Sequence, residues 1–184
     1  MSEETRFRKA VLFANVAENP QLHEKLDQSE VARAIDRCLK RMERAAEIFN
    51  GRMIRLVGDA LMAVFDSVDD AYQAAIEMQQ RVADLPPVSG SKLEICIAFS
   101  WGLVTISHGT AAGKSVDLAA ALAKLAAPGQ MLTTLPAQSA LAPELKKATR
   151  PLDLNFAFGG ETPSKLKIFE MLVPELPFRA VYSR

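Results

Sequence analysis

Hydrophobic positions recur with two different spacings in the first half of the chain, and the changes between them mark the predicted elements. Residues 9–16 (KAVLFANV) are almost continuously apolar, which predicts a strand buried on both faces. Pro20 then stands as in the first turn of a short helix. A longer helix is expected to open at Ser29-Glu30 and to end at Asn50-Gly51, because a glycine often follows a helix. Its apolar residues recur every three or four positions and predict one core-facing stripe: Ile35, Leu39, Met42, Ala46 and Phe49.

Residues 53–65 have the pattern of a β-hairpin. Two apolar runs, MIRLV and ALMAVF, flank Gly58-Asp59, a dipeptide that suits a two-residue turn. The polar residues of 66–69 offer capping groups for a second helix. The apolar stripe predicted for this helix is Ala71, Ala75, Met78 and Val82. Residues 92–107 (KLEICIAFSWGLVTIS) are long enough for one extended strand or a bent pair, so the first half has the order β-α-β-β-α-β.

This order is that of the ferredoxin-like arrangement, an α+β fold. In it the first strand lies beside the third and antiparallel to it, so Asn15 is expected close to the residue that follows Asp59. The second half predicts a C-terminal α/β extension of this βαββαβ core. It has a helix over 116–126, a strand at 131–134, a short helix, and alternating strand patterns in LDLNFAF and KLKIFEML.

Length and composition fit one folded domain in solution. With 184 residues, of which 49% are hydrophobic and 24% charged, we expect one domain over 1–184, its core at about 9–172 and a tail or linker at 173–184. Lys plus Arg and Asp plus Glu both number 22, so no net field would attract nucleic acid or an anionic membrane. The charged N-terminus lacks an apolar signal region, and no apolar run could span a bilayer. We therefore expect a cytoplasmic protein without membrane insertion.

The cysteines and histidines are dispersed along the chain. Cys38 and Cys96 fall in a predicted helix and a predicted strand, no CxxC pair exists, and His23 and His108 are isolated. A metal site built from sulfur or imidazole is therefore not expected. Buried thiols and surface histidines are the expected arrangement, since a reducing cytoplasm disfavours disulfides.

Four blocks of the sequence resemble the catalytic domain of class III nucleotidyl cyclases, the adenylate and guanylate cyclase family. They run from about Lys9 to Leu172: VLFANV, QLHEKL, GRMIRLVGDALMAVFDSVDDAYQAAIEMQ and AAGKSVDLAAALAKLAAPGQMLTT. The resemblance implies a head-to-tail dimer whose active sites are built from both protomers. One protomer holds two metal ions with two aspartates, and these ions assist the ribose 3′-oxygen in attacking the α-phosphate. The other protomer reads the base, orients the ribose and neutralises charge in the transition state.

At the positions that the resemblance implies, this chain departs from the family almost everywhere. The second metal aspartate is kept, as Asp59. The replacements are Asn15 for the first metal aspartate, Pro20 for a small hydroxyl residue in the phosphate turn, Arg55 for the base-reading lysine, Thr110 near its acidic partner, Asp117 for the ribose-orienting asparagine, Ala121 for the transition-state arginine, and Phe158-Gly159 for a late lysine and glycine.

These replacements predict loss of the cyclase reaction. Asn15 offers a neutral carbonyl oxygen, whereas hard divalent cations favour carboxylates. Ala121 places nothing against developing negative charge, and loss of one such donor costs a factor of about 100–1000 in rate. Asp117 adds a negative charge where a polyphosphate should lie. Both sides of the composite site are affected, so an intact partner is not expected to restore it.

The sequence therefore predicts a cyclase-homology domain that is inactive and serves as a dimerisation or ligand-sensing module in intracellular signal transduction. Its expected partner is a second copy or another cyclase-homology domain, with other signalling domains or proteins as further candidates. No cofactor is expected, and Mg²⁺ or Mn²⁺ would bind only together with residual nucleotide. The alternative is an active atypical cyclase that converts a nucleoside triphosphate to cyclic nucleotide and pyrophosphate with Asp59 as its single carboxylate. Simpler roles stay open: Asp59 as a turn residue, Arg55 as a surface or interface residue, and Asn15 as a hydrogen-bond partner of the hairpin tip.

The segment GTAAGKS, residues 109–115, has a superficial likeness to a P-loop. A P-loop needs four residues between its first glycine and the Gly-Lys pair, whereas Gly109 and Gly113 enclose three. We expect a loop that joins a sheet strand to the following helix, where Lys114 and the helix start attract an anion weakly. A P-loop hydrolase is the third and weakest functional hypothesis.

Overall fold

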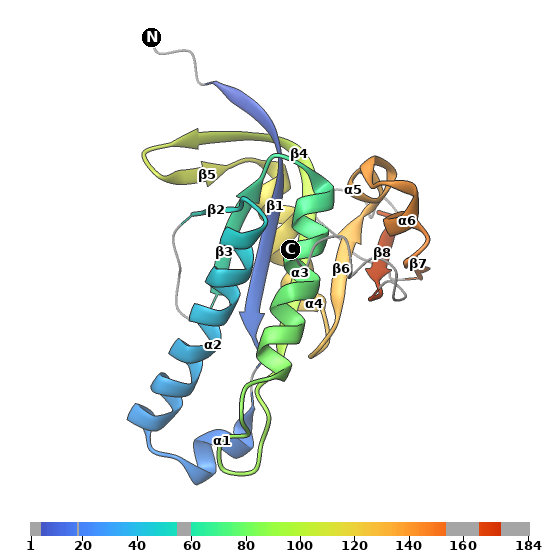
Figure 1. The fold of residues 1–184 in the computed structure, drawn as a ribbon. Helices are drawn as coiled ribbons and strands as arrows, with labels where there is room; N and C mark the ends of the chain where they lie inside the picture. Colours follow the sequence, from blue (N-terminus) through green and yellow to red (C-terminus); the bar gives the residue numbers. More distant parts are fainter. Residues whose placement is uncertain (1–4, 18, 55–59, 154–165, 174–184) are drawn as a thin grey trace.

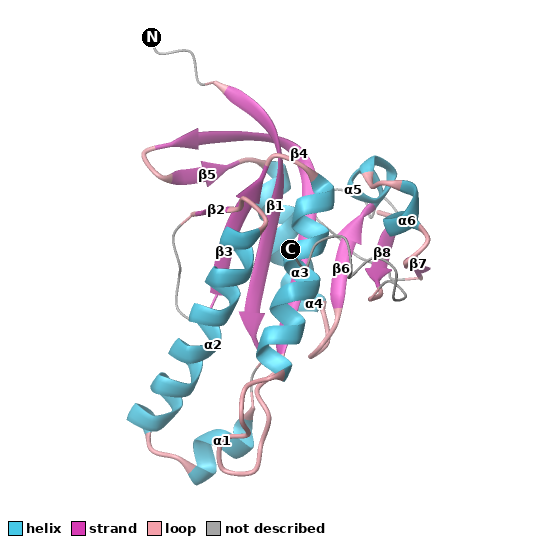
Figure 2. Ribbon diagram, viewed as in Figure 1, coloured by secondary structure: helices cyan, strands magenta, loops and turns pink. Residues whose placement is uncertain are grey.

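The computed structural model describes residues 5–17, 19–54, 60–153 and 166–173. In these ranges a mixed sheet forms the centre, with strands in the order β2-β3-β1-β4-β6-β8-β7 and with β5 paired to β4 (Figures 1 and 2). The strands are β1 (Arg6–Val16), β2 (Arg52–Met53), β3 (Ala60–Phe65), β4 (Ile95–Ser107), β5 (Thr110–Ala112), β6 (Met131–Thr134), β7 (Thr149–Leu152) and β8 (Ile168–Met171). The helices are α1 (Pro20–Lys25), α2 (Gln28–Ile48), α3 (Val68–Ala83), α4 (Lys114–Leu125), α5 (Leu135–Ala140) and α6 (Pro143–Lys146). No described helix has the length and hydropathy that crossing a bilayer requires.

The first half of the chain has the predicted ferredoxin-like arrangement. Strands β2, β3, β1 and β4 lie in this order, and each neighbouring pair is antiparallel. β1 starts at Arg6, earlier than the predicted residue 9. Asn15 near its end pairs with Ala60 at the start of β3, as the topology predicts. The α+β class and the ferredoxin-like core are confirmed.

Helix α2 begins and ends at local capping groups. The Oδ1 atom of Asp27 accepts a hydrogen bond from the backbone N–H of Glu30 at 2.9 Å, so the helix opens at Gln28, just before the predicted start. Asn50 adopts a φ of 62°, and Gly51 N–H donates to Ala46 O at 2.8 Å, which ends the helix where the sequence predicts.

The predicted stripe of α2 is wrong in part. Of its members only Met42 and Ala46 are fully buried, while Ile35, Leu39 and Phe49 are partly buried. The buried residues of α2 are Val31, Ala34, Cys38, Met42, Ala45 and Ala46. Small residues dominate this set because α2 packs against both the sheet and α3, and close contact between two helices favours small side chains.

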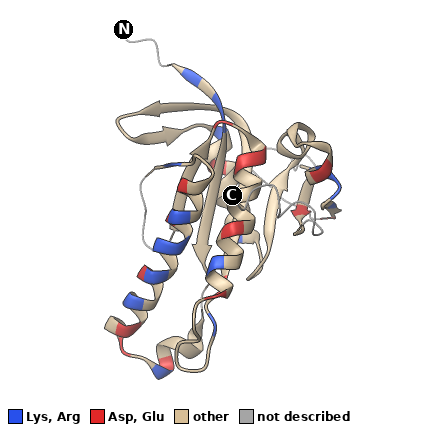
Figure 3. Cartoon of the chain, in the orientation of Figure 1, with Lys and Arg blue, Asp and Glu red and all other residues tan. Residues whose placement is uncertain are grey.

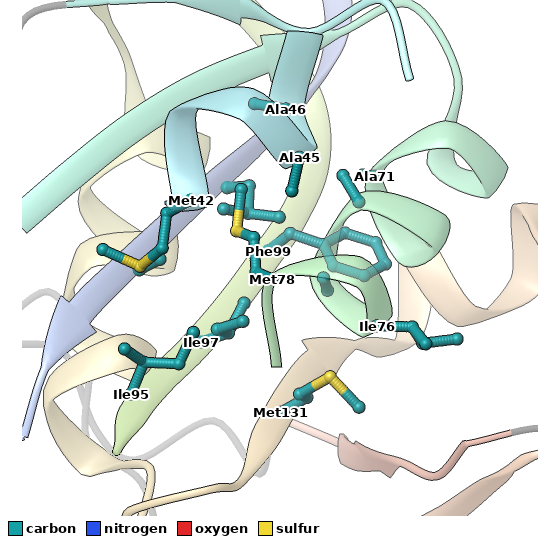
Figure 4. Packing of buried hydrophobic residues seen from close by; sticks show 14 of the residues in the cluster. Met42, Ala45, Ala46, Ala71, Ile76, Met78, Ile95, Ile97, Phe99 and Met131 are labelled. Carbon is teal, nitrogen blue, oxygen red and sulfur yellow. The ribbon is translucent and has the colours of Figure 1, made fainter. Parts of the chain in front are cut away.

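The main core lies between the sheet and helices α2 and α3, which cover one face, while α4 covers the other (Figure 1). Strand β4 contributes to both sides because successive side chains of a strand point to opposite faces. Ile95, Ile97 and Phe99 pack in the cluster beneath α2 and α3 (Figure 4). Cys96 and Ala98 pack beneath α4. A strand buried on both faces explains why residues 95–99 read as a continuous apolar run.

The C-terminal half forms the predicted α/β extension. Helix α4 leads the chain from β4 to β6, which is parallel to β4, and β8 and β7 follow as antiparallel neighbours. The expected single helix before β7 is divided into α5 and α6. Tyr72 ties α3 to this extension, because its buried hydroxyl donates to Leu172 O at 2.6 Å and lies 3.2 Å from Ala148 O.

Gly51 lies where the end of α2 packs closely on β3. A Cβ atom at this position would lie 2.6 Å from Cε1 of Phe65 and 2.9 Å from Ala46 O. Phe65 is itself 1% exposed and has little room to move. We therefore expect Gly51→Ala to lower the free energy of unfolding by about 1–3 kcal/mol, measured by urea denaturation. An unchanged midpoint and slope would show that the two elements can separate without cost.

Candidate functional site

Asn15 lies near the end of β1, at one corner of the sheet and on the face that α4 covers. Val11 and Phe13 pack with α4 residues, and side chains alternate along a strand, so Asn15 shares their face. Its strand neighbours are Ala60 on β3 and Cys96 on β4. The Oδ1 atom of Asn15 is buried and has no hydrogen-bond partner among the described residues. This corner therefore contains a neutral, desolvated oxygen at the first predicted metal position.

Thr110 lies at the far end of β4 from this corner. It is exposed, it pairs with Ser107, and its hydroxyl donates to Ser107 O at 2.7 Å. Cys96, the neighbour of Asn15, lies near the start of β4 and Ser107 at its end. A strand rises about 3.3 Å per residue, which places Thr110 and Asn15 up to about 35 Å apart. One chain does not bring these two predicted positions together.

Asp117 and Ala121 lie one turn apart on the outward side of α4. The opposite side of the helix is buried through Val116, Ala119 and Leu122. Asp117 is exposed in the first turn, where the helix dipole favours a carboxylate, so it also has a structural role. Ala121 is half-buried and ends in a methyl group. The helix therefore presents a carboxylate and a methyl group where the resemblance implies an amide and a guanidinium.

Three small residues fix α4 against β4, and two of them, Ser100 and Gly102, carry no prediction from the sequence. The hydroxyl of Ser100 donates to the Ser115 carbonyl at 2.6 Å. Gly102 leaves room for the Ser115 side chain, which a Cβ atom at residue 102 would meet. Gly113 precedes the helix with φ 139° and ψ 173°, a region essentially restricted to glycine. The available signal is the Ser-x-Gly spacing on β4 followed by Gly-x-Ser at the helix start.

Residues 109–115 do not form a simple loop, so this expectation is wrong. Gly109 lies in a turn with φ 75°, Thr110–Ala112 form β5, and α4 starts at Lys114. β5 pairs antiparallel with Thr105–Ser107, because β4 extends beyond α4 and leaves an edge to which the chain can return. In a P-loop, consecutive N–H groups curl around one phosphate, whereas this backbone is extended. The geometry gives a P-loop hydrolase no support.

The residues that the structure describes at the corner of the sheet beside Asn15 do not fit a two-metal site. Arg55, Asp59 and Phe158-Gly159 lie outside the described residues. Within the described ranges, no group of three or more His, Cys, Asp or Glu residues could hold a metal ion. Asn15 supplies a neutral oxygen, which a hard divalent cation prefers less than a carboxylate. Burial raises the pKa of the neighbouring Cys96 thiol, and the charge of Glu94 raises it further, so Cys96 is a poor source of a thiolate ligand.

The dispersed cysteines and histidines lie where the sequence predicts. Cys38 and Cys96 are buried free thiols, and their side chains belong to the cores on opposite faces of the sheet. His23 and His108 are exposed. His108 adopts a φ of 49° in the turn between β4 and β5, which gives it a local backbone role.

Gly113 offers a test of how tightly α4 is fixed. We expect Gly113→Ala to lower the free energy of unfolding by about 1–3 kcal/mol, because a φ of 139° strains any residue with a Cβ atom. The added atom would also lie 3.1 Å from Leu103 O. Urea denaturation measures the change, and Lys114→Ala, at an exposed neighbour, should stay within about 0.5 kcal/mol of the native protein. Equal effects of the two substitutions would contradict the strain argument.

The chain has the fold of the catalytic domains of adenylate and guanylate cyclases. The catalytic core of a rhodopsin-guanylyl cyclase, solved with ATPαS, matches with a TM-score of 0.81 at 15% identity, over 93% of this chain and 99% of that one. An adenylate/guanylate cyclase/hydrolase from Silicibacter pomeroyi matches with a TM-score of 0.77 at 20% identity, over 92% and 98%. A dimeric guanylyl cyclase domain from Blastocladiella emersonii gives a TM-score of 0.77 at 14% identity, over 93% and 99%. At these identities the likeness establishes the fold alone.

Curated relatives match parts of the sequence. An uncharacterized protein of Mycobacterium tuberculosis is 34% identical over 82 residues, which are 45% of this chain and 21% of the relative. An adenylate cyclase of Glutamicibacter nicotianae is 25% identical over 128 residues, which are 68% of this chain and 30% of the relative. The matches therefore span less than a third of the length of either relative. No family model matches the chain.

Proposed function

We propose that this chain is a cyclase-homology domain that has lost the cyclase reaction and works as a dimerisation or ligand-sensing module in signal transduction. The observation that carries the proposal is Ala121. It lies on the outward side of α4, half-buried, where the resemblance implies the arginine that neutralises the transition state. A methyl group cannot donate a hydrogen bond or carry charge, and removal of one such donor costs a factor of about 100–1000.

Two further positions, Asn15 and Asp117, also support loss of the cyclase reaction. The buried oxygen of Asn15 is neutral and so stabilises a divalent cation less than a carboxylate does. The exposed carboxylate of Asp117 lies one turn before Ala121 and would repel the negative charge of a polyphosphate. The metal side and the transition-state side of the implied site are thus both weakened.

We propose that the module pairs with a second cyclase-homology domain, either a copy of itself or another chain. The position of Thr110, up to about 35 Å from Asn15 along β4, supports this, because a composite site that uses both residues would need a second chain. A solved neighbour in fold is itself dimeric. Cytoplasmic signalling remains part of the same proposal.

The proposal is tested by a product assay on the purified chain. ATP, GTP, CTP and UTP are each incubated with Mg²⁺ or Mn²⁺, and cyclic nucleotide and free phosphate are both measured. We expect neither product above the protein-free control. Cyclic product that disappears in an Asp59→Ala variant would instead establish an active enzyme. Phosphate release that disappears in Lys114→Ala would establish a hydrolase.

An atypical active cyclase is the second candidate. It is favoured by Asp59, one retained carboxylate directly before β3, and by partial identity to a protein named adenylate cyclase. A thermal-shift titration separates nucleotide binding from turnover, since a ligand of the folded state raises stability by RT ln(1 + [L]/Kd). A shift with nucleotide and Mn²⁺ but without product would support a ligand-sensing role, and no shift would support a role in protein pairing.

A further inference from the structure

Helix α2 presents a line of arginines on the side of the sheet opposite to α4. Arg37, Arg41 and Arg44 follow the spacing i, i+4, i+7, which places them on one stripe of the helix, and Ile48 continues this stripe at i+11. We call these four residues the arginine stripe. All four are exposed, Ile48 to 48%. At 1.5 Å per residue the stripe is about 17 Å long.

The arginine stripe has no internal charge compensation in the described part of the chain. The ion pair found on α2 joins Lys40 to Asp36 at 3.0 Å, and no described carboxylate lies within 4.0 Å of the guanidinium of Arg37, Arg41 or Arg44. Like charges at i, i+4 and i, i+3 destabilise a helix. An uncompensated line of this kind therefore favours an external anionic partner over a purely structural role.

Acidic residues border the arginine stripe on both sides. Glu43 and Glu47 lie on the adjacent stripe of α2, each one residue before a member of the arginine stripe, and the same adjacent stripe contains the Asp36–Lys40 ion pair. On the other side lies α3, which carries Asp70 and also Glu77, the latter paired with Arg81 at 2.8 Å (Figure 3). A bilayer surface or a nucleic-acid duplex is wide enough to meet these carboxylates as well, and would be repelled by them. The basic line fits a narrow partner.

We infer that the arginine stripe binds an acidic α-helix of a partner protein. Three carboxylates at i, i+4 and i+7 of such a helix match the three guanidinium groups, which can each bind a carboxylate through two parallel hydrogen bonds. An apolar side chain one turn further along the helix covers Ile48. This surface is on the layer opposite to α4, so it is separate from Asn15, Asp117 and Ala121 and leaves these three residues free to pair with a second domain.

A designed peptide tests the inference. The probe is a labelled, alanine-based helical peptide with Glu at i, i+4 and i+7 and Leu at i+11, and the control peptide has the same composition with these residues dispersed around the helix. Fluorescence anisotropy at low ionic strength should show saturable binding of the probe. Because two ion pairs become repulsive contacts, Arg37→Glu combined with Arg41→Glu should weaken binding at least about tenfold. Added salt should weaken the native complex as well.

A matched variant controls for net charge. Lys147→Glu combined with Lys167→Glu makes the same change in charge at exposed positions of the C-terminal extension and should alter probe affinity less than about twofold. Arg37→Gln combined with Arg41→Gln keeps good helix formers and gives a second measurement if charge reversal unfolds the chain. The inference is overturned by absent probe binding, by equal affinity for the control peptide, or by an unchanged affinity in both arginine variants. Tighter binding to anionic vesicles or to a DNA duplex than to the probe would also overturn it.

Discussion

Replacing Phe99 by alanine is expected to lower the free energy of unfolding by about 3–5 kcal/mol. Phe99 is 0% exposed and lies on β4 between Leu12 of β1 and Thr133 of β6. Its ring points into the main core beside Met78 (Figure 4). The neighbours are held by two paired strands and a helix, so they can close the resulting cavity only in part. Urea denaturation measures the loss directly.

The matched control for Phe99→Ala is Phe7→Ala. Phe7 is also an aromatic residue of a central strand, but it is 45% exposed near the start of β1. Its ring lies 5.6 Å from the ammonium group of Lys9, an exposed contact, so its removal should cost less than about 1 kcal/mol. A similar loss in both variants would contradict the assignment of the main core.

Cys38 is expected to make the protein less stable in alkaline solution. Burial raises the pKa of its thiol from an ordinary 9.0 to about 11. The folded state thus keeps this proton to a higher pH than the unfolded state, so stability is fully present below pH 9 and decreases as pH rises toward 11. The expected decrease is up to about 2 kcal/mol. Urea denaturation at successive pH values between these limits measures it.

Cys38→Ala isolates the contribution of this thiol. Without this thiol, the decrease of stability between pH 9 and pH 11 should become smaller. Part of the decrease should remain, because burial also raises the pKa values of Tyr72 and Cys96. A thiol reagent should modify Cys38 of the native protein only at the rate of unfolding, because the side chain is fully buried. An identical pH dependence in the variant and the native chain would contradict the argument.

Much of the fold could be predicted from the sequence because local signals and tertiary packing agree in it. The apolar run of residues 9–16, the cap at Ser67 and the glycine after α2 each act within a few residues of where they stand. The order β-α-β-β-α-β then limits the topology to few choices, one of which places Asn15 beside Ala60. That pairing is confirmed in the structure.

Other features depend on contacts between distant residues, and the sequence pattern misses them. Large side chains define the predicted stripe of α2, yet Ala34, Cys38 and Ala45 are the buried ones, because α3 packs close to them. The pairing of Thr110–Ala112 with β4 requires β4 to run past α4, which no local pattern in residues 109–115 indicates. The arginine stripe is visible as a spacing, but its isolation from carboxylates requires coordinates.

The candidate site was predictable as a set of positions rather than as a geometry. Asn15 lies at the predicted corner beside Ala60, and the structure adds that Asp117 and Ala121 lie on the outward side of α4, while their roles stay predictions. The separation of Thr110 from Asn15 follows from the length of β4, which forms one continuous strand. The sequence alone is compatible either with one long strand here or with a bent pair of strands. Arg55 and Asp59 lie outside the described residues, so their roles stay predictions.

The single long strand β4 sets the distance between the corner at Asn15 and the hairpin formed by β4 and β5. It pairs with β1 from Ile95 to Thr105 and with β5 from Thr105 to Ser107. Deleting one residue from its middle would shorten that spacing by about 3 Å and turn every later side chain to the opposite face. Insertions and deletions should therefore be tolerated far less along this strand than substitutions at its exposed end.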